Sequence, residues 1–90
     1  EEEPPITVLA PGHIVVQGTV LLDDIADYVT IEGHEHDVHT IGGLVMAELG
    51  RRPTIGDEIA LGAVTLRVEG VDRLAVTLVS LHFEPSLSVH

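Results

Sequence analysis

The chain has 90 residues, a formal net charge of −11 and no cysteine, and its hydrophobic fraction of 44% includes almost no aromatic residues. A chain of this length holds one small core rather than two domains. Fifteen acidic residues against four arginines exclude nucleic acid as a partner, because phosphate groups would be repelled. The missing cysteines exclude disulfides and thiolate metal sites, and no segment reaches the roughly 18 apolar residues of a membrane span.

Composition along the chain predicts three parts. Residues 1–5, three glutamates followed by two prolines, are expected to be a linker. Residues 6–84 carry all the periodic patterns and are expected to form the domain. Residues 85–90 have no periodicity and are expected to be an unordered tail.

The first half of the domain predicts a hairpin and a helix. The β-prone runs 6–9 and 13–17 flank a Pro11-Gly12 turn. A helix is predicted over residues 21–29, with Leu22 and Ile25 on its apolar face. Three aspartates at 23, 24 and 27 could bind a cation, but acids near a helix start also stabilise the helix dipole, and this is the simpler interpretation.

The loop at residues 30–39 is rich in metal-ligand side chains. His34, His36 and His39 lie among several carboxylates, and imidazole and carboxylate are ligands for Zn²⁺, Ni²⁺ or Cu²⁺. The spacing fits no standard zinc motif, so the alternative is an ordinary solvated loop. These three histidines are the candidate metal ligands of the sequence.

A second helix is predicted over residues 41–50. Thr40 can cap its start, and Gly50 with Pro53 ends it. Gly42 and Gly43 are unusual in a first helical turn, where each costs about 1 kcal/mol relative to alanine. Two interpretations are open: a bare backbone that lets another segment pack closely, or amides that bind a phosphate or carboxylate. Thr40, Gly42 and Gly43 are therefore candidate cofactor-binding residues.

Three strands are predicted after Gly56-Asp57, where the apolar period changes to two. Turns are expected at 62–63 and 70–73. Near the end the parity changes, because Leu74, Val76 and Leu78 are followed by Val79, Leu81 and Phe83 in the opposite phase. Either the strand bulges near Leu78 or both of its faces are covered. In the second case Val79, Leu81 and Phe83 would form an interface, most simply with a second copy of the chain.

These elements predict an α/β (α+β) fold with two helices packed on a largely antiparallel sheet. Its expected core is aliphatic and comprises Val16, Leu22, Ile25, Leu44, Val45, Leu49, Ile59, Leu66, Val68, Val76 and Leu78.

The order of the motifs resembles the transporter-associated domain of the CorC/HlyC family. The resemblance is carried by His39-Thr40-Ile41-Gly42-Gly43-Leu44-Val45, Leu49-Gly50-Arg51-Arg52-Pro53 and Gly56-Asp57, with Ile14-Val15-Val16-Gln17-Gly18 as the opening strand. Gln17 and His39 stand where the family usually has aspartate. The resemblance implies a fold similar to an FAD-binding domain of flavoenzymes.

The resemblance also implies a function. Such domains follow a pair of CBS domains, often with a membrane-spanning domain, in haemolysin-like proteins linked to Mg²⁺ and Co²⁺ efflux. The expectation is a cytoplasmic, non-catalytic regulatory or interaction module of an integral or peripheral membrane protein, with the CBS pair and membrane domain as partners. No Ser-His-acid, cysteine or H-E-x-x-H constellation supports an enzyme. The alternative is a sensor of a divalent metal, or of an adenine nucleotide or flavin; no cofactor is required.

Overall fold

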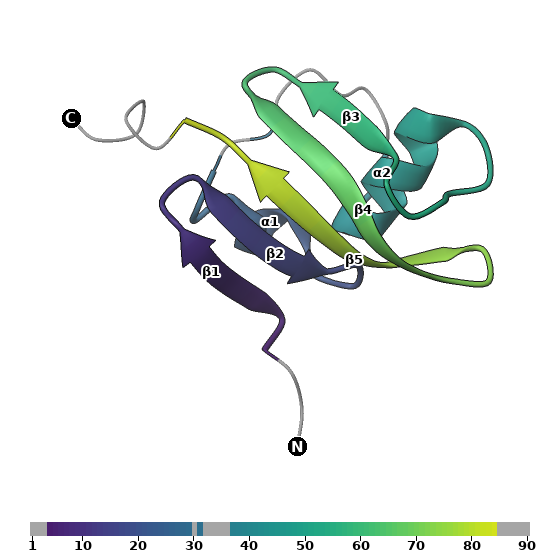
Figure 1. Ribbon diagram of the computed structural model, residues 1–90, viewed down its shortest axis with the longest axis horizontal. Helices are drawn as coiled ribbons and strands as arrows, with labels where there is room; N and C mark the ends of the chain where they lie inside the picture. Colours follow the sequence, from purple (N-terminus) through teal and green to yellow (C-terminus); the bar gives the residue numbers. More distant parts are fainter. Residues whose placement is uncertain (1–3, 30, 32–36, 85–90) are drawn as a thin grey trace.

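A computed structural model describes residues 4–29, 31 and 37–84. They form a five-stranded antiparallel sheet in the order β1-β2-β5-β4-β3, with both helices on one of its faces (Figure 1). The elements in chain order are β1 (Ile6–Ala10), β2 (His13–Gln17), α1 (Leu22–Ile25), α2 (Ile41–Leu49), β3 (Glu58–Leu61), β4 (Val64–Asp72) and β5 (Ala75–His82). The predicted fold class is confirmed. Residues 1–3 of the predicted linker, the predicted tail 85–90, and His34 and His36 lie outside the described residues.

The last strand lies in the middle of the sheet and joins its two hairpins. The N-terminal hairpin β1-β2 turns at Gly12, which has φ 81°, and β3-β4 turns at Gly62, which has φ 61°. Strand β5 then pairs with β2 on one side and β4 on the other. Strands that are far apart in sequence therefore meet in the sheet.

The core is built from inward residues of the three central strands and from the helices. Each inward position of β5 lies between an inward position of β2 and one of β4: Val79 pairs with Val16 and Val68, and Leu81 with Ile14 and Leu66. All six side chains are at most 2% exposed. The helices cover them with Ile25, Ile41, Leu44 and Val45, which are fully buried.

A bulge explains the change of parity near the end of the chain. The β4-β5 register shifts on both sides of Gly70, which pairs with Leu78. Thr77 is the extra residue of β5, because it has no partner between Leu78 and Val76. It lets Val76 face the core before the bulge, and Val79 and Leu81 after it. Glycine at position 70 leaves space for the Thr77 side chain, because a Cβ on residue 70 would lie 2.7 Å from the Thr77 hydroxyl oxygen.

The bulge corrects several predictions about β5. Val79 and Leu81 are 0% exposed in the core of their own chain, so the prediction of a dimer interface on them is wrong. Phe83 is partly buried and packs against the same core. The turn lies at Arg73 and Leu74, later than predicted, and Leu74 is 57% exposed rather than inward.

Most of the predicted core is confirmed. Of the remaining predicted positions, Leu22, Leu49 and Ile59 are partly buried against the core. Leu78 is also partly buried, but it pairs with Gln17 on the sheet face opposite the helices, so its assignment to the core is wrong. The reason is the bulge, which places its neighbour Val79 inward.

The first helix is shorter than predicted. α1 is one helical turn, and the chain continues to Val29 as a series of turns in which the Val29 amide donates to the carbonyl of Ile25 at 3.0 Å. No basic residue stabilises its C-terminal end, and Asp27 places a negative charge there, where the helix dipole disfavours it. α2 begins at the predicted residue, and Gly50 caps its end with φ 67°. Within the described residues, neither helix is long and apolar enough to cross a membrane.

Candidate functional site

The predicted cofactor residues lie at the junction of α2 with the loop after β2. The Gly43 amide donates to the Thr40 hydroxyl at 3.1 Å, as predicted for an N-cap. The Ile41 amide donates to the Val20 carbonyl at 3.0 Å, and the Gly42 amide to the Gly18 carbonyl at 2.9 Å. A phosphate or carboxylate at this helix start would have to compete with these bonds.

Close packing accounts for Gly42. A Cβ at this position would lie 2.8 Å from the Gly18 carbonyl oxygen and 3.1 Å from that of Val76. Gly18 is still tighter, because a Cβ there would overlap the Val76 carbonyl oxygen. Gly18 also donates its amide to the Thr77 carbonyl at 2.9 Å, so three segments meet through backbone groups alone. These contacts support the first interpretation of Gly42, a bare backbone that lets another segment pack closely.

The Arg51 and Asp57 side chains close the turn between α2 and β3. The guanidinium donates two hydrogen bonds to the two carboxylate oxygens, at 3.1 and 2.9 Å. The same carboxylate accepts bonds of 2.9 Å from the backbone amide and from the hydroxyl of Thr54. The Gly-Arg-x-Pro and Gly-Asp motifs thus meet in one clasp that fixes where β3 begins.

Hydrogen bonding dominates the electrostatics of this clasp. The bond from Arg51 and then those from Thr54 hold the pKa of Asp57 well below its usual range. The same bond to Asp57 raises the pKa of Arg51. Both groups therefore stay charged at neutral pH, and the clasp has a structural rather than a proton-transferring role.

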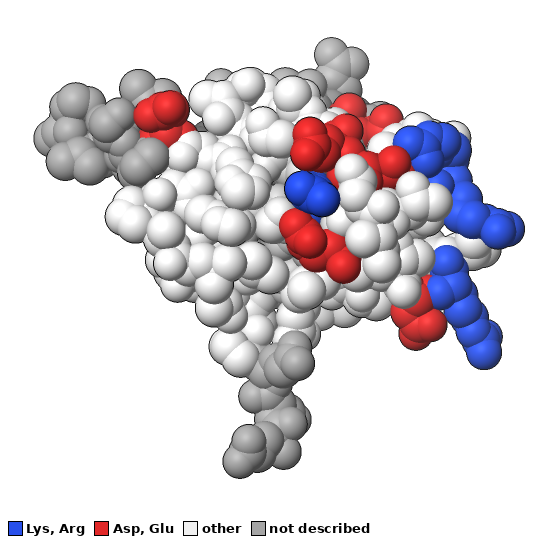
Figure 2. Space-filling model, viewed as in Figure 1, with Lys and Arg blue, Asp and Glu red and all other residues white. Residues whose placement is uncertain are grey.

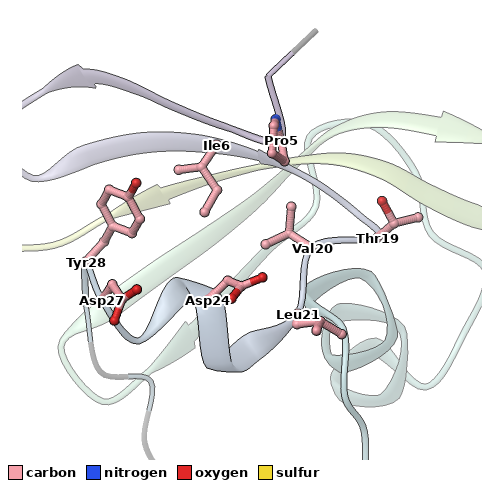
Figure 3. Close-up of a pocket in the computed structure, with 8 residues that line it drawn as sticks. All are labelled: Pro5, Ile6, Thr19, Val20, Leu21, Asp24, Asp27 and Tyr28. Carbon is pink, nitrogen blue, oxygen red and sulfur yellow. The ribbon is translucent and has the colours of Figure 1, made fainter. Parts of the chain in front are cut away.

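An open pocket of about 430 Å³ lies between β1 and the α1 segment (Figure 3). Tyr28 stands at one end, Thr19 and Leu21 at the other, with Asp24 and Asp27 on the helical side. The rest of the lining is apolar and comprises Pro5, Ile6 and Val20. Two carboxylates beside an aromatic ring suit a cationic group such as an arginine or lysine side chain of a partner.

The predicted metal residues have different outcomes in the structure. His39 is exposed, and its carbonyl accepts a bond of 2.8 Å from the Leu22 amide. The other two histidines of that set lie outside the described residues, so the metal prediction for the loop stays untested. Among residues 4–29, 31 and 37–84, no group of three or more histidines, aspartates or glutamates is placed to hold a metal, and this includes the three aspartates of the α1 segment.

Two histidines outside the predicted metal set lie together on neighbouring strands. The rings of His13 on β2 and His82 on β5 stack with centroids 4.0 Å apart and an interplanar angle of 23°. They are direct cross-strand partners. Their separation in sequence hid this contact, since only the β2-β5 register reveals it.

Charge is unevenly distributed over the sheet face that carries no helix. In Figure 2, charged groups gather over the side of β3 and β4, while the surface over β1, β2 and β5 is almost free of them. Ser80 on β5 is 1% exposed there, and its hydroxyl donates to Glu69 at 2.8 Å.

Comparison with known proteins identifies the domain. A family model described as a transporter associated domain, CorC_HlyC, matches residues 7–85. The chain is 35% identical over 72 residues to the UPF0053 protein YhdT of Bacillus subtilis (strain 168), a match covering 80% of this chain. The matched part of this chain corresponds to only 15% of the length of that relative.

Solved structures share the fold. A hemolysin domain from Enterococcus faecalis V583 superposes with a TM-score of 0.77 at 26% identity, covering 89% of this chain and 98% of that one. A region described as associated with a Mg²⁺ and Co²⁺ transporter (CorC), from Neisseria meningitidis MC58, has a TM-score of 0.78 at 22% identity, covering 90% and 100%. The chain belongs to the CorC_HlyC family of transporter associated domains.

Proposed function

We propose that this domain is a non-catalytic regulatory or interaction module on the cytoplasmic side of a larger CorC/haemolysin-like protein that handles Mg²⁺ or Co²⁺. The observation that carries the proposal is that the residues of the family motifs bond to other groups of the domain itself. Thr40, Gly42, Arg51 and Asp57 make bonds that hold the fold together. These bonds give the four residues the roles of a scaffold.

The pocket beside α1 is the part of the surface best suited to contact the rest of such a protein. Tyr28 is 42% exposed and Leu21 48% exposed, so both offer apolar area to a partner. Asp24 and Asp27 add negative charge to the same pocket. We infer that a basic side chain of the CBS pair or of the membrane domain binds here.

The proposal is tested in the full-length protein that carries this domain. Deleting the domain should leave the protein in the membrane but change its Co²⁺ or Mg²⁺ efflux, measured in cells loaded with each ion. Asp24→Asn combined with Asp27→Asn should reproduce part of that change, whereas Asp72→Asn, at the exposed end of β4, should not. Unaltered efflux after deletion would rule out a regulatory role.

The alternative of ligand sensing predicts a different result with the domain alone. If an adenine nucleotide or flavin binds at Thr40, Gly42 and Gly43, titration with FAD should quench flavin fluorescence. Replacing Thr40 by alanine should then weaken the quenching. The interaction proposal predicts no saturable quenching, because the amides of Gly42 and Gly43 already donate to groups of the chain.

A further inference from the structure

The stacked histidines lie on the sheet face opposite the helices. On β2 and β5 the buried neighbours Ile14 and Leu81 point into the core, so His13 and His82 point to the other side. Both strands are firmly paired there, and the Phe83 amide donates to the Gly12 carbonyl at 2.9 Å just beyond them. On this paired backbone His82 is exposed and His13 is half-buried.

The two histidine rings are close enough neighbours for one metal ion to reach both. Each imidazole nitrogen binds Zn²⁺ at about 2.0–2.1 Å, with the ion in the plane of its ring. The ring centroids are 4.0 Å apart. Because the rings are stacked, both would have to turn about their side-chain torsions until one nitrogen of each points to a common ion.

Among the residues that the structure describes, the surroundings of the two rings offer no further protein ligand, so water would fill the other coordination positions of an ion bound there. Thr65 is the cross-strand neighbour of His82 on its other side. The charged groups of the neighbouring rows are Glu58 and Arg67, which are cross-strand partners, and Glu69, whose carboxylate lies 3.8 Å from the Arg67 guanidinium. In the described part of the chain, no third histidine or carboxylate completes a group of three with the pair.

We propose that His13 and His82 form a two-imidazole binding site for a borderline divalent transition metal, in the class of Co²⁺, Ni²⁺, Cu²⁺ and Zn²⁺. Neutral imidazole suits these ions, whereas Mg²⁺ takes oxygen ligands and dehydrates reluctantly. The site therefore separates Co²⁺ from Mg²⁺ by ligand chemistry. A net charge of −11 raises the local concentration of either cation but does not choose between them. The inference goes beyond the proposed function, and each can hold without the other.

The test removes the competing histidines first. In a background of His34→Ala, His36→Ala and His39→Ala, the histidines left are His13, His82 and His90. Zn²⁺ is titrated near neutral pH while the imidazole proton resonances are followed by NMR, and Co²⁺ is titrated by visible absorption. We expect two histidines to shift together and saturate at one metal per chain, with no shift for Mg²⁺. Binding should weaken in acid, because a protonated imidazole cannot bind a metal ion.

Variants assign the site and can overturn it. His13→Ala and His82→Ala should each abolish the saturable shift, whereas His90→Ala, the matched control, should leave it unchanged. If each single variant keeps one metal with unchanged affinity, the rings bind separately and the shared site is wrong. The titration of the unmutated pair does not depend on whether these variants fold: if neither ring responds to Zn²⁺, the proposal fails.

Discussion

The backbone amide of Gly42, in the first turn of α2, donates a hydrogen bond of 2.9 Å to the carbonyl oxygen of Gly18, just after β2. This bond joins the helix start to the sheet at a point where neither residue has a side chain to keep them apart. It explains why a glycine that weakens the isolated helix stabilises the folded domain.

Gly42→Ala should therefore destabilise the domain although alanine is the better helix former. The new methyl group would meet the backbone oxygen of Gly18 at 2.8 Å, and such overpacking typically costs about 1–3 kcal/mol. Chemical denaturation measures the loss. Gly43→Ala is the matched control in the same turn: its methyl group meets the Thr40 side-chain oxygen at 3.1 Å, and about 1 kcal/mol of helix propensity offsets the contact. Equal stability of Gly42→Ala and the parent chain would contradict the packing role.

Asp57→Asn should lower stability at neutral pH and change how stability depends on acid. The folded pKa of Asp57 is lowered, so the unfolded chain binds the proton more readily. The stabilisation is complete above the unfolded value of about 3.9 and is lost as pH falls through the lower folded value. The difference from the parent chain should therefore be largest above pH 4 and shrink below it.

Thermal unfolding across this pH range checks the acid dependence. Asp72→Asn is the control, since Asp72 is exposed at the end of β4. Arg51→Lys should show a weaker form of the same effect, because an ammonium group cannot make the two parallel bonds of the guanidinium. If Asp57→Asn and Asp72→Asn give the same pH profile, the clasp does not stabilise the fold.

Leu81→Ala should cost about 2–5 kcal/mol, the range for a large aliphatic side chain removed from a core. Leu81 is fully buried between Ile14 and Leu66. Leu78→Ala, on the same strand but facing away from the helices, should cost clearly less. Urea denaturation of both variants distinguishes the two faces of β5. A small loss for Leu81→Ala would return this residue to the surface and reopen the interface interpretation.

Ser80→Ala should destabilise the domain by about 1.5–3 kcal/mol, the range for a hydrogen bond to a charged group. Its hydroxyl is the donor to Glu69 at 2.8 Å, and the serine is almost fully buried. Thr77→Ser, an exposed change on the same strand, is the control. Glu69→Gln keeps an acceptor oxygen, so it should lower the free energy of unfolding less than Ser80→Ala does. Chemical denaturation of both variants measures the difference.

Local chemistry made α2 and its ends predictable from the sequence. The Thr40 cap, the apolar stripe and the left-handed Gly50 depend on residues within one or two helical turns of one another. The same holds for the turns at Gly12 and Gly62, whose positive φ angles follow from glycine itself. The motifs that carry the family resemblance lie in these local segments, so the family was predictable as well.

Tertiary structure alone decided the place of β5 and what its residues do. Alternation places side chains on two faces, but it does not say which strand lies on either side. The change of phase near Leu78 also left open whether the strand bulges there or has both of its faces covered. The pairing of β5 with both β2 and β4 buries Val79 and Leu81, and the register shift at Gly70 makes that possible. The same pairing brings His13 to His82 across most of the chain, because hydrogen bonds between distant strands, rather than neighbours in sequence, determine that contact.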